Sequence, residues 1–323
     1  MKAKEWTGII PGVGKPVSRI FFGTAAGPML AGEDVGELLD GVLARGVNAF
    51  DCARSYGKAE NCLGRWMAER GNREHVVVLT KCGDIREGIV KVNRGVIREQ
   101  LAVSLETLQT DYIDIYLLHR DDPETEVGEF IETLNEAKGE GKIRVFGVSN
   151  WTPERIRAAN QYAAEKGLEG FTVSSPNWGL TLQIKDLWGG GCVTVSGPEH
   201  QEDREWYART GMPVVAYSSL GRGFFSGRFR AGDEEGARRV LDEYAQKGYL
   251  YPENMERLRR AEILAEELGM TVPEIAMRYV FSTEMDVYAV VSTLNLSRLE
   301  QNIRAAKNPL TDEQVRFLES GEV

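Results

Sequence analysis

The feature that most constrains the fold is a regular alternation of short apolar segments with segments of helical periodicity. Between the apolar segments, hydrophobic residues recur at spacings of three and four, as in residues 34–45. Strands that alternate with helices form parallel sheets, and eight such units in 323 residues predict a closed (β/α)₈ barrel. The predicted strands are residues 19–22, 47–51, 76–81, 113–118, 145–148, 171–174, 214–217 and 287–291.

The predicted helices complete the same pattern. Thr152 followed by Pro153 is a strong helix start, because a hydroxyl caps the first turn and proline suits the first helical position. The predicted helices are residues 34–45, 60–70, 94–108, 127–140, 153–166, 202–209, 253–268, 273–281, 296–305 and 311–318.

No segment is rich enough in Pro, Gly or Ser to act as a linker, so we expect residues 1–323 to form one barrel domain. Residues 1–16 are Gly-rich and polar, and we expect a short hairpin or a loose arm there. Residues 178–200 carry Trp188 followed by three glycines. This pattern predicts a loop at the rim of the barrel, either a lid or an exposed insertion.

Composition excludes several classes of protein. A net charge of −10 argues against a nucleic-acid-binding protein, which usually has a basic face. The sequence has no apolar run of membrane-spanning length and no signal-peptide core at its start. The four cysteines form no CxxC pair, so they indicate free thiols and a cytoplasmic protein. The three histidines are scattered, and we expect no metal site.

Three successive predicted strands run into residues that suit proton transfer. Asp51, Lys81 and His119 stand at these strand ends, and Tyr56 follows the first in a short loop. Each residue alone could have a structural role in a loop or in the core. Strand ends of a parallel barrel share one rim, where the functional residues of such barrels lie. The joint occurrence therefore predicts an active site.

Four separated motifs resemble the aldo-keto reductase family, over residues 17–318. They are the segment FDCARSYGKAE at residues 50–60, Lys81, the Leu-His-Arg segment at 118–120, and the Gly-Val-Ser-Asn segment at 147–150. Cys52 stands where members usually have Thr. The resemblance implies a (β/α)₈ barrel that reversibly reduces an aldehyde or ketone to an alcohol with NAD(P)H. The sequence contains no GxGxxG fingerprint that would support a Rossmann mode of binding.

The resemblance also implies roles for the four strand-end residues. Tyr56 would act as general acid and protonate the carbonyl oxygen. A free tyrosine has a pKa of about 10, and a nearby ammonium such as that of Lys81 lowers this value. Asp51 would hold Lys81 charged and in place. His119 would donate a hydrogen bond to the substrate oxygen or relay the proton.

Further residues are implied at the nicotinamide and pyrophosphate parts of the cofactor. Ser149 and Asn150 would bind the carboxamide, and Ser175 stands where members often have Gln, which weakens a third contact. Tyr217 would stack on the nicotinamide ring, although it could also be a simple rim tyrosine. The remaining residues in this group are Gly23, Thr24, Ser218, Leu220, Gly221 and Arg222.

The adenosine end is matched by Ser292, Arg298, Gln301 and Asn302. Many members carry Lys at the position of Ser292, and that lysine is absent here. Arg298 remains, and a guanidinium suits a phosphate group. The sequence therefore favours NADP(H), with NAD(H) as the alternative.

Candidate substrate contacts are Arg120, Trp151, Trp178 and Trp188. Aromatic faces beside hydrogen-bonding groups suit a hydroxylated, sugar-like carbonyl compound. Three rival functions stay open at this point. One is an NAD-dependent aldose or alcohol dehydrogenase, and another is a nucleotide-sensing subunit without catalysis. The third is a barrel hydrolase that uses the paired carboxylates of Asp121 and Asp122.

Overall fold

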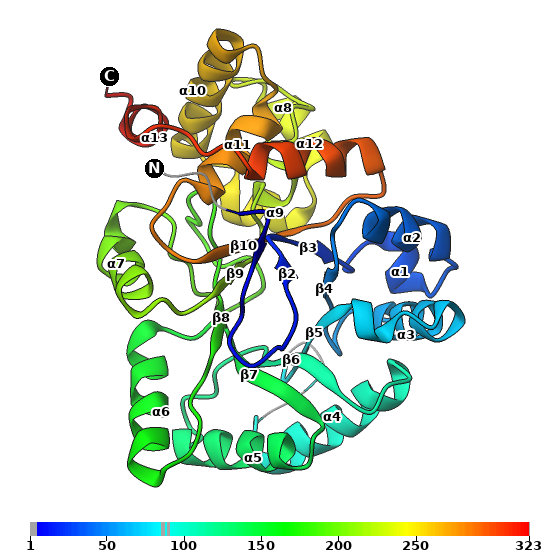
Figure 1. Cartoon of the computed structure of the whole chain (residues 1–323). Coiled ribbons are helices and arrows are strands. Elements are labelled where there is room, and N and C mark those ends of the chain that lie inside the picture. The colour runs from blue at the N-terminus through cyan, green and yellow to red at the C-terminus, as the bar shows by residue number, and fades with distance from the viewer. Residues whose placement is uncertain (1–4, 85–87, 89–90, 323) are drawn as a thin grey trace. The chain divides into compact units, whose positions relative to one another are not determined.

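The computed structural model describes residues 5–84, 88 and 91–322 (Figure 1). Its eight barrel strands follow the order β10-β3-β4-β5-β6-β7-β8-β9 in a closed barrel, as the alternation of strands and helices predicted. The strand pairs β3–β4, β4–β5, β5–β6, β6–β7, β7–β8 and β9–β10 are parallel. The strands are β3 (Ile20–Gly23), β4 (Ala49–Asp51), β5 (Val77–Cys82), β6 (Ile113–Leu118), β7 (Ile143–Ser149), β8 (Val173–Ser175), β9 (Val214–Ala216) and β10 (Val287–Val291).

Every predicted helix is present in the structure. Thr152 caps α6 as expected, because its side chain accepts a hydrogen bond from the Arg155 amide and Pro153 opens the helix. The matching helices are α2 (Gly36–Ala44), α3 (Ala59–Arg70), α4 (Arg94–Thr107), α5 (Val127–Gly139), α6 (Pro153–Lys166), α7 (Gln201–Thr210), α10 (Pro252–Leu268), α11 (Val272–Phe281), α12 (Leu296–Ala306) and α13 (Asp312–Ser320).

Several short elements were not predicted. They are too short for helical periodicity to show, and polar residues cap two of them: Asp233 and Asp242 accept hydrogen bonds at the starts of α8 and α9. The additional elements are α1 (Gly27–Ala31), α8 (Glu234–Val240), α9 (Glu243–Tyr249) and the 3₁₀ turns η1 (Arg73–His75), η3 (Pro198–His200) and η4 (Gly221–Gly223).

The structure contains a hairpin at the N-terminal end of the described residues, and its second strand lies just beyond the predicted arm of residues 1–16. Strands β1 (Thr7–Gly8) and β2 (Val17–Ser18) pair antiparallel. The first four residues of the predicted arm lie outside the described residues.

Contacts within the chain divide it into two compact units. The first unit contains Thr7–Ser175 and Ser292–Leu296, and therefore holds β1 to β8. The second contains Pro176–Val291 and residues 297–322, with residues 5–6, and holds β9, β10 and α7 to α11. The prediction of a single domain stays a prediction, and each unit is described by itself below.

Strand register in the first unit aligns the ends of its strands. Asp51 pairs with Leu79 across β4 and β5, and Cys82 pairs with Leu118 across β5 and β6. Helices α4, α5 and α6 pack successively against one another outside these strands (Figure 1). The residues that end β4, β5 and β6 therefore emerge at one edge of the sheet.

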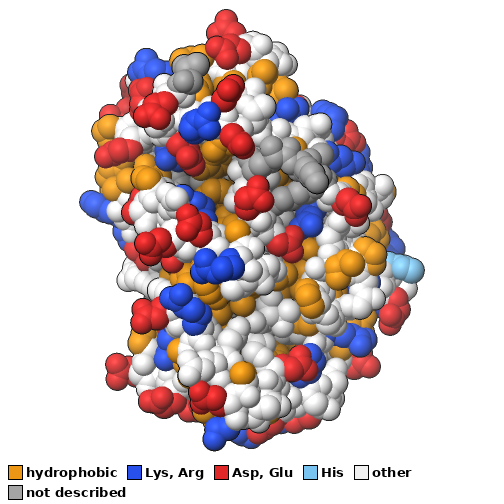
Figure 2. Space-filling view, turned by 60° about the vertical axis from the view of Figure 1, so that its left-hand side comes forward, with side chains coloured by type: hydrophobic (Ala, Val, Ile, Leu, Met, Phe, Trp, Pro, Cys, Tyr) orange, Lys and Arg blue, Asp and Glu red, His pale blue; other side chains and the backbone are white. Residues whose placement is uncertain are grey.

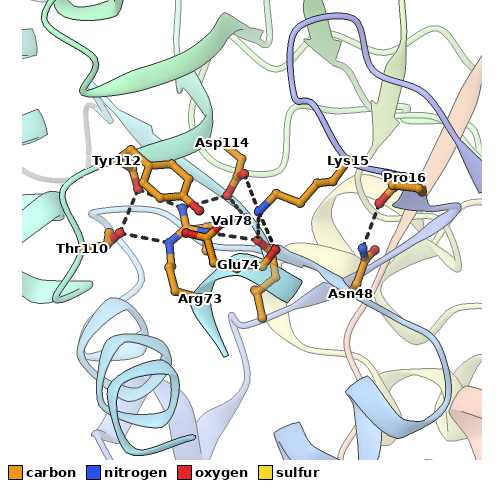
Figure 3. A network of polar contacts seen from close by, with 10 residues as sticks. Lys15, Pro16, Asn48, Arg73, Glu74, Val78, Thr110, Tyr112 and Asp114 are labelled. Atoms are coloured by element: carbon orange, nitrogen blue, oxygen red, sulfur yellow. Dashed lines mark hydrogen bonds and ion pairs between the residues drawn. The ribbon is translucent and has the colours of Figure 1, made fainter. Parts of the chain in front are cut away.

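The opposite ends of these strands are tied together by a buried carboxylate (Figure 3). Asp114 of β6 is fully buried and lies 3.0 Å from Lys15 and 2.8 Å from Arg73. It also accepts a hydrogen bond from the Val78 amide. The guanidinium of Arg73 lies over the Tyr112 ring, 3.9 Å from its centroid. This network joins the loop between β1 and β2 to β5 and β6.

The surface carries charges of both signs. Acidic, basic and apolar side chains are interspersed over the face shown in Figure 2. In the part of the chain that the structure describes, no helix has the length and apolar character needed to cross a membrane.

Candidate active site

The end of β4 and the end of β5 carry a buried ion pair. Lys81 Nζ lies 2.5 Å from Asp51 Oδ1 and also donates a hydrogen bond to the Cys52 carbonyl at 2.8 Å. Burial raises the pKa of Asp51 more than the neighbouring cation lowers it. Burial by itself lowers the pKa of Lys81, but the charges of Asp51 and Tyr56 outweigh it and the pKa is raised. Lys81 is therefore held as a cation beside the strand ends.

Tyr56 lies beside this cation. The Tyr56 amide donates to the Ala53 carbonyl, and the Arg54 amide donates to the Lys81 carbonyl, so the loop after β4 turns back onto β5. The Tyr56 ring centroid is 5.0 Å from Lys81 Nζ. The rings of Tyr56 and His119 meet edge to face with centroids 5.9 Å apart. The structure thus brings together the four residues predicted at the strand ends, which are Asp51, Tyr56, Lys81 and His119.

His119 has an acidic neighbour that the sequence reasoning missed. Its Nδ1 lies 3.4 Å from Asp84 Oδ2 and 3.5 Å from Ser55 Oγ. Asp84 is 1% exposed, so its charge acts at short range with little screening by water. The only signal in the sequence was an acidic residue three positions after Lys81.

The end of β7 connects this group to a cluster of polar side chains. Asn150 has a left-handed backbone, with φ at 61°, and its Nδ2 donates to the His119 carbonyl and to Ser149 Oγ. Ser149 Oγ donates to the Ser175 carbonyl at 2.9 Å. All three predicted carboxamide-binding residues are therefore buried together near His119.

Gly23, Thr24 and Ser292 lie beside the Asp51 backbone in the same unit. Thr24 Oγ1 donates to the Asp51 carbonyl, and Ser292 Oγ donates to the Gly23 carbonyl, each at 2.9 Å. These contacts place three of the predicted cofactor residues at one edge of the first unit.

In the second unit, the segment after β9 forms a tight turn. Ser218 and Arg222 have φ values of 54° and 48°, and the Gly221 amide donates to the Ser218 carbonyl at 2.7 Å. Leu220 lies in the middle of this turn. A left-handed backbone at a residue other than glycine is strained and is frequent at ligand-binding sites.

Arg222 contacts side chains from two other segments of this unit. It forms an ion pair with Asp242 at 2.5 Å, and its guanidinium lies over the rings of Trp188 and Tyr244. Trp188 in turn lies beside Tyr217, with ring centroids 5.7 Å apart. Two predicted cofactor residues and one predicted substrate residue are therefore assembled in one aromatic group.

The loop that carries Trp188 is held by one carboxylate. Asp186 accepts hydrogen bonds from the amides of Trp188 and Cys192, at 2.8 and 2.7 Å. Partial burial raises the pKa of Asp186, but these backbone bonds outweigh it and the pKa is about 2. The glycine-rich segment is thus tied back by hydrogen bonds, and the question of a lid stays a prediction.

Helix α12 carries the predicted adenosine residues on one face. Arg298, Gln301 and Asn302 stand at helical spacings of three and four, which places them side by side. Arg298 is exposed, and Asn302 is buried against the unit.

Two of the predicted substrate contacts have the surroundings of core residues. Trp151 is fully buried, with its ring 5.3 Å from Phe130 and 5.2 Å from Phe171. Trp178 stacks on Tyr279 and donates to the Val280 carbonyl. Arg120 is also buried, at 3% exposure. A role of these residues in substrate binding stays a prediction.

The paired carboxylates of the hydrolase alternative take part in local structure. Asp121 forms an ion pair with Arg155 at 3.1 Å. Asp122 accepts hydrogen bonds from the amides of Val92 and Glu124. Within the described ranges, no group of three or more His, Cys, Asp or Glu residues is arranged to hold a metal ion.

A model of the aldo/keto reductase family matches residues 19–321, which is most of the chain. The chain belongs to the aldo/keto reductase family. The matched range spans Asp51, Tyr56, Lys81 and His119. It also confirms the resemblance that the sequence motifs carried.

Individual members of the family are similar over most of their length. The chain is 31% identical over 306 residues to the putative aryl-alcohol dehydrogenase AAD14 of Saccharomyces cerevisiae, covering 89% of this chain and 76% of that protein. It is 27% identical over 282 residues to the aldo-keto reductase str7 of Strobilurus tenacellus, covering 86% and 78%.

A solved structure supports the same fold. The glycerol dehydrogenase AKR11B4 from Gluconobacter oxydans superposes with a TM-score of 0.76, at 23% identity over 98% of this chain and 97% of that one. Membership of the family implies an oxidoreductase that acts on small carbonyl compounds or alcohols, and the family generally uses nicotinamide cofactors.

Proposed function

We propose that the protein reversibly reduces an aldehyde or ketone to an alcohol with NAD(P)H, and that Tyr56 is the general acid. One observation carries this proposal: the Tyr56 ring lies 5.0 Å from the Lys81 ammonium, which Asp51 holds in a buried ion pair. A cation beside a phenol favours its ionised form, and so makes it a better proton donor.

Each unit, taken by itself, offers groups that suit part of a nicotinamide dinucleotide. Ser149 and Asn150 offer hydroxyl and amide groups next to His119, which suit a carboxamide. The strained turn at Ser218–Arg222 and the exposed Arg298 of α12 suit phosphate groups. When bound, the cofactor would supply or accept the hydride at the carbonyl carbon.

The side chains of this chain would handle the proton and the oxygen. Tyr56 would donate its proton to the carbonyl oxygen during reduction and accept it back during oxidation. Lys81 would stabilise the phenolate that is left, and Asp51 would keep Lys81 oriented and charged. His119, held from behind by Asp84, would donate a hydrogen bond to the same oxygen and so fix its position.

Arg298 leads us to propose NADP(H) as the preferred cofactor. A guanidinium can bind a phosphate with two parallel hydrogen bonds, which a ribose hydroxyl cannot match. Arg298→Ala should weaken NADPH binding by about tenfold or more and leave NADH binding within about twofold. Fluorescence titration of both nucleotides checks this, and equal losses for both would contradict a contact to the 2′-phosphate.

The substrate is proposed as a small carbonyl compound with hydroxyl groups. Aromatic aldehydes are a second candidate, because the rings of Trp188, Tyr217 and Tyr244 are grouped in the second unit and because AAD14 bears the name of an aryl-alcohol dehydrogenase. A panel that pairs hydroxylated aldehydes with aryl aldehydes of similar size separates the two. The free cysteines fit a reducing compartment, and we propose the cytoplasm.

Replacement of the Tyr56 hydroxyl tests the proposed function. Tyr56→Phe should lower kcat by about 10²–10⁴-fold, the usual worth of general acid catalysis, while the dissociation constant of the nucleotide stays unchanged. Tyr162→Phe is the matched control, because Tyr162 is a surface residue bonded to Glu132. Unchanged turnover in Tyr56→Phe would remove Tyr56 from the mechanism. Tight nucleotide binding by the wild type without any turnover would instead favour a sensing subunit.

A further inference from the structure

Glu60 is a buried carboxylate of the sequence motif that the proposed mechanism leaves unused. It stands in the first turn of α3 and is 1% exposed. Four side chains donate hydrogen bonds to it, a full set for its two oxygens. Oε1 accepts from Thr80 and Ser104, each at 2.7 Å, and Oε2 accepts from Arg54 at 2.6 Å and Thr107 at 3.0 Å.

Two of these four donors adjoin the proposed catalytic residues. Arg54 stands two residues before Tyr56, and its ion pair with Glu60 closes a short loop that contains Tyr56. Thr80 directly precedes Lys81 in β5. The backbones of the two segments are also joined, since the Arg54 amide donates to the Lys81 carbonyl at 3.0 Å. The carboxylate of Glu60 therefore touches both segments whose separation sets the distance from Tyr56 to Lys81.

We propose that Glu60 is a positioning residue that holds the loop of Tyr56 against the strand of Lys81. This contact, called the clamp below, fixes the distance between the Tyr56 phenol and the Lys81 ammonium. The contact that matters is the charged one to Arg54. Ser104 and Thr107 of α4 donate the two remaining, neutral hydrogen bonds to this carboxylate. A hydrogen bond between two charged groups is stronger than one to a neutral hydroxyl, so the loss of one hydroxyl should displace the carboxylate less than the loss of Arg54.

The clamp explains why this position carries an ion rather than a neutral residue. An ion pair with one buried partner is weak evidence for stability, because desolvation of the charges offsets their attraction. It does fix geometry, since the Arg54 guanidinium and the Glu60 carboxylate are held 2.6 Å apart. Small displacements of reacting groups lower rates strongly: about 1 Å can cost roughly 10²-fold.

Glu60→Gln and Arg54→Met test the clamp with two independent readouts. The first is the ionisation of Tyr56 in the free protein, followed by ultraviolet difference absorbance with Tyr56→Phe as the blank. The second is the separation of kcat from KM in carbonyl reduction, the proposed function on which this inference rests. Ser104→Ala is the matched control, because it removes one bond to the same carboxylate and leaves Arg54 and Thr80 in place.

Both variants should move the ionisation of Tyr56 to higher pH, because the ammonium is no longer held close to the phenol. They should lower kcat roughly 10–100-fold, with KM within about threefold. The kcat of the double variant should be no lower than that of the more impaired single variant, since both substitutions remove the same interaction. Ser104→Ala should resemble the wild type in both readouts.

Three results would overturn the inference. One is that Tyr56 ionises at the same pH in both variants as in the wild type, with kcat within about twofold of the wild-type value. Another is an equal loss in Ser104→Ala, which would point to general loosening. The third is full additivity of the two single variants. If Glu60→Gln does not fold, Arg54→Met decides alone, because Arg54 is partly exposed. If the wild type reduces no carbonyl, the proposed function fails, and the titration still decides on the clamp.

Discussion

Asp51 and Lys81 come from neighbouring strands and meet as an ion pair of 2.5 Å with both side chains nearly shielded from solvent. Such a pair is costly to form, and removal of one partner leaves an uncompensated charge in the protein interior. The pair therefore links stability to the site: the same contact that keeps Lys81 charged beside Tyr56 also holds β4 and β5 together at their ends.

Lys81→Met should abolish most turnover and destabilise the protein by about 3–5 kcal/mol, because Asp51 is left buried and unpaired. The double variant with Asp51→Asn should recover part of this stability but no turnover. Denaturant unfolding and steady-state kinetics measure both effects. Wild-type kcat in Lys81→Met would contradict the role of the ammonium.

The same pair predicts an alkaline dependence of stability. The pKa of Lys81 is raised in the folded protein, so its contribution is complete below the unfolded lysine value of about 10.4 and is lost as pH rises through the folded value. The free energy of unfolding of the wild type should fall across this range by more than that of the Asp51→Asn, Lys81→Met variant. Parallel curves for the two proteins would show that the pair is not the source.

Asp84→Asn should shift the ring NMR signals of His119, because it removes the charged group that lies 3.4 Å from Nδ1. The chain has three histidines, so their ring signals can be followed by NMR and assigned with His119→Gln. Asp203→Asn, which removes the partner of His200, should leave the His119 signal unchanged. An unshifted His119 signal in Asp84→Asn would mean that the carboxylate does not act on the imidazole.

Asp114→Asn should destabilise the protein by about 3–5 kcal/mol without loss of kcat, because two cations lose their shared buried partner far from the catalytic strand ends. Thermal or denaturant unfolding measures the first effect, and kinetics at a temperature where the variant is folded measures the second. Asp111→Asn is the control, since Asp111 is exposed on the approach to the same strand. A loss of stability no greater than that of the control would contradict a structural role for the network.

Asp186→Asn should destabilise the folded conformation of the Trp188 loop by about 1 kcal/mol. This figure is reduced for solvent screening, because the carboxylate is partly exposed. The pKa of Asp186 is lowered to about 2, so its contribution is complete above the ordinary value of about 3.9 and is lost as pH falls through about 2. The wild-type tryptophan fluorescence should change in that range, and the variant should lack this change. An identical acid titration in both proteins would exclude Asp186 as the anchor.

Local patterns predicted the barrel strands and the longer helices. Thr152 and Pro153 predicted the start of α6 because capping depends on neighbouring residues alone, and the apolar runs predicted β5 and β6 because buried strands must be apolar. The helices α8 and α9 were missed, since each is too short for periodicity to show. Contacts of Trp151 and Trp178 with substrate were predicted from their positions after strand ends and stay predictions. The burial of both rings could not be predicted, because it depends on neighbours from distant segments, such as Phe130 and Tyr279.

Sequence alone determined that strands alternate with helices and that an acid, a phenol, a lysine and a histidine follow successive strand ends. Strand periodicity and helix capping are local, so both can be read along the chain. Only the tertiary structure decided that Asp84 lies against His119 and that Glu60 holds both Arg54 and Thr80. Those contacts join residues of different strands, helices and loops, and their distances depend on how the elements pack in three dimensions.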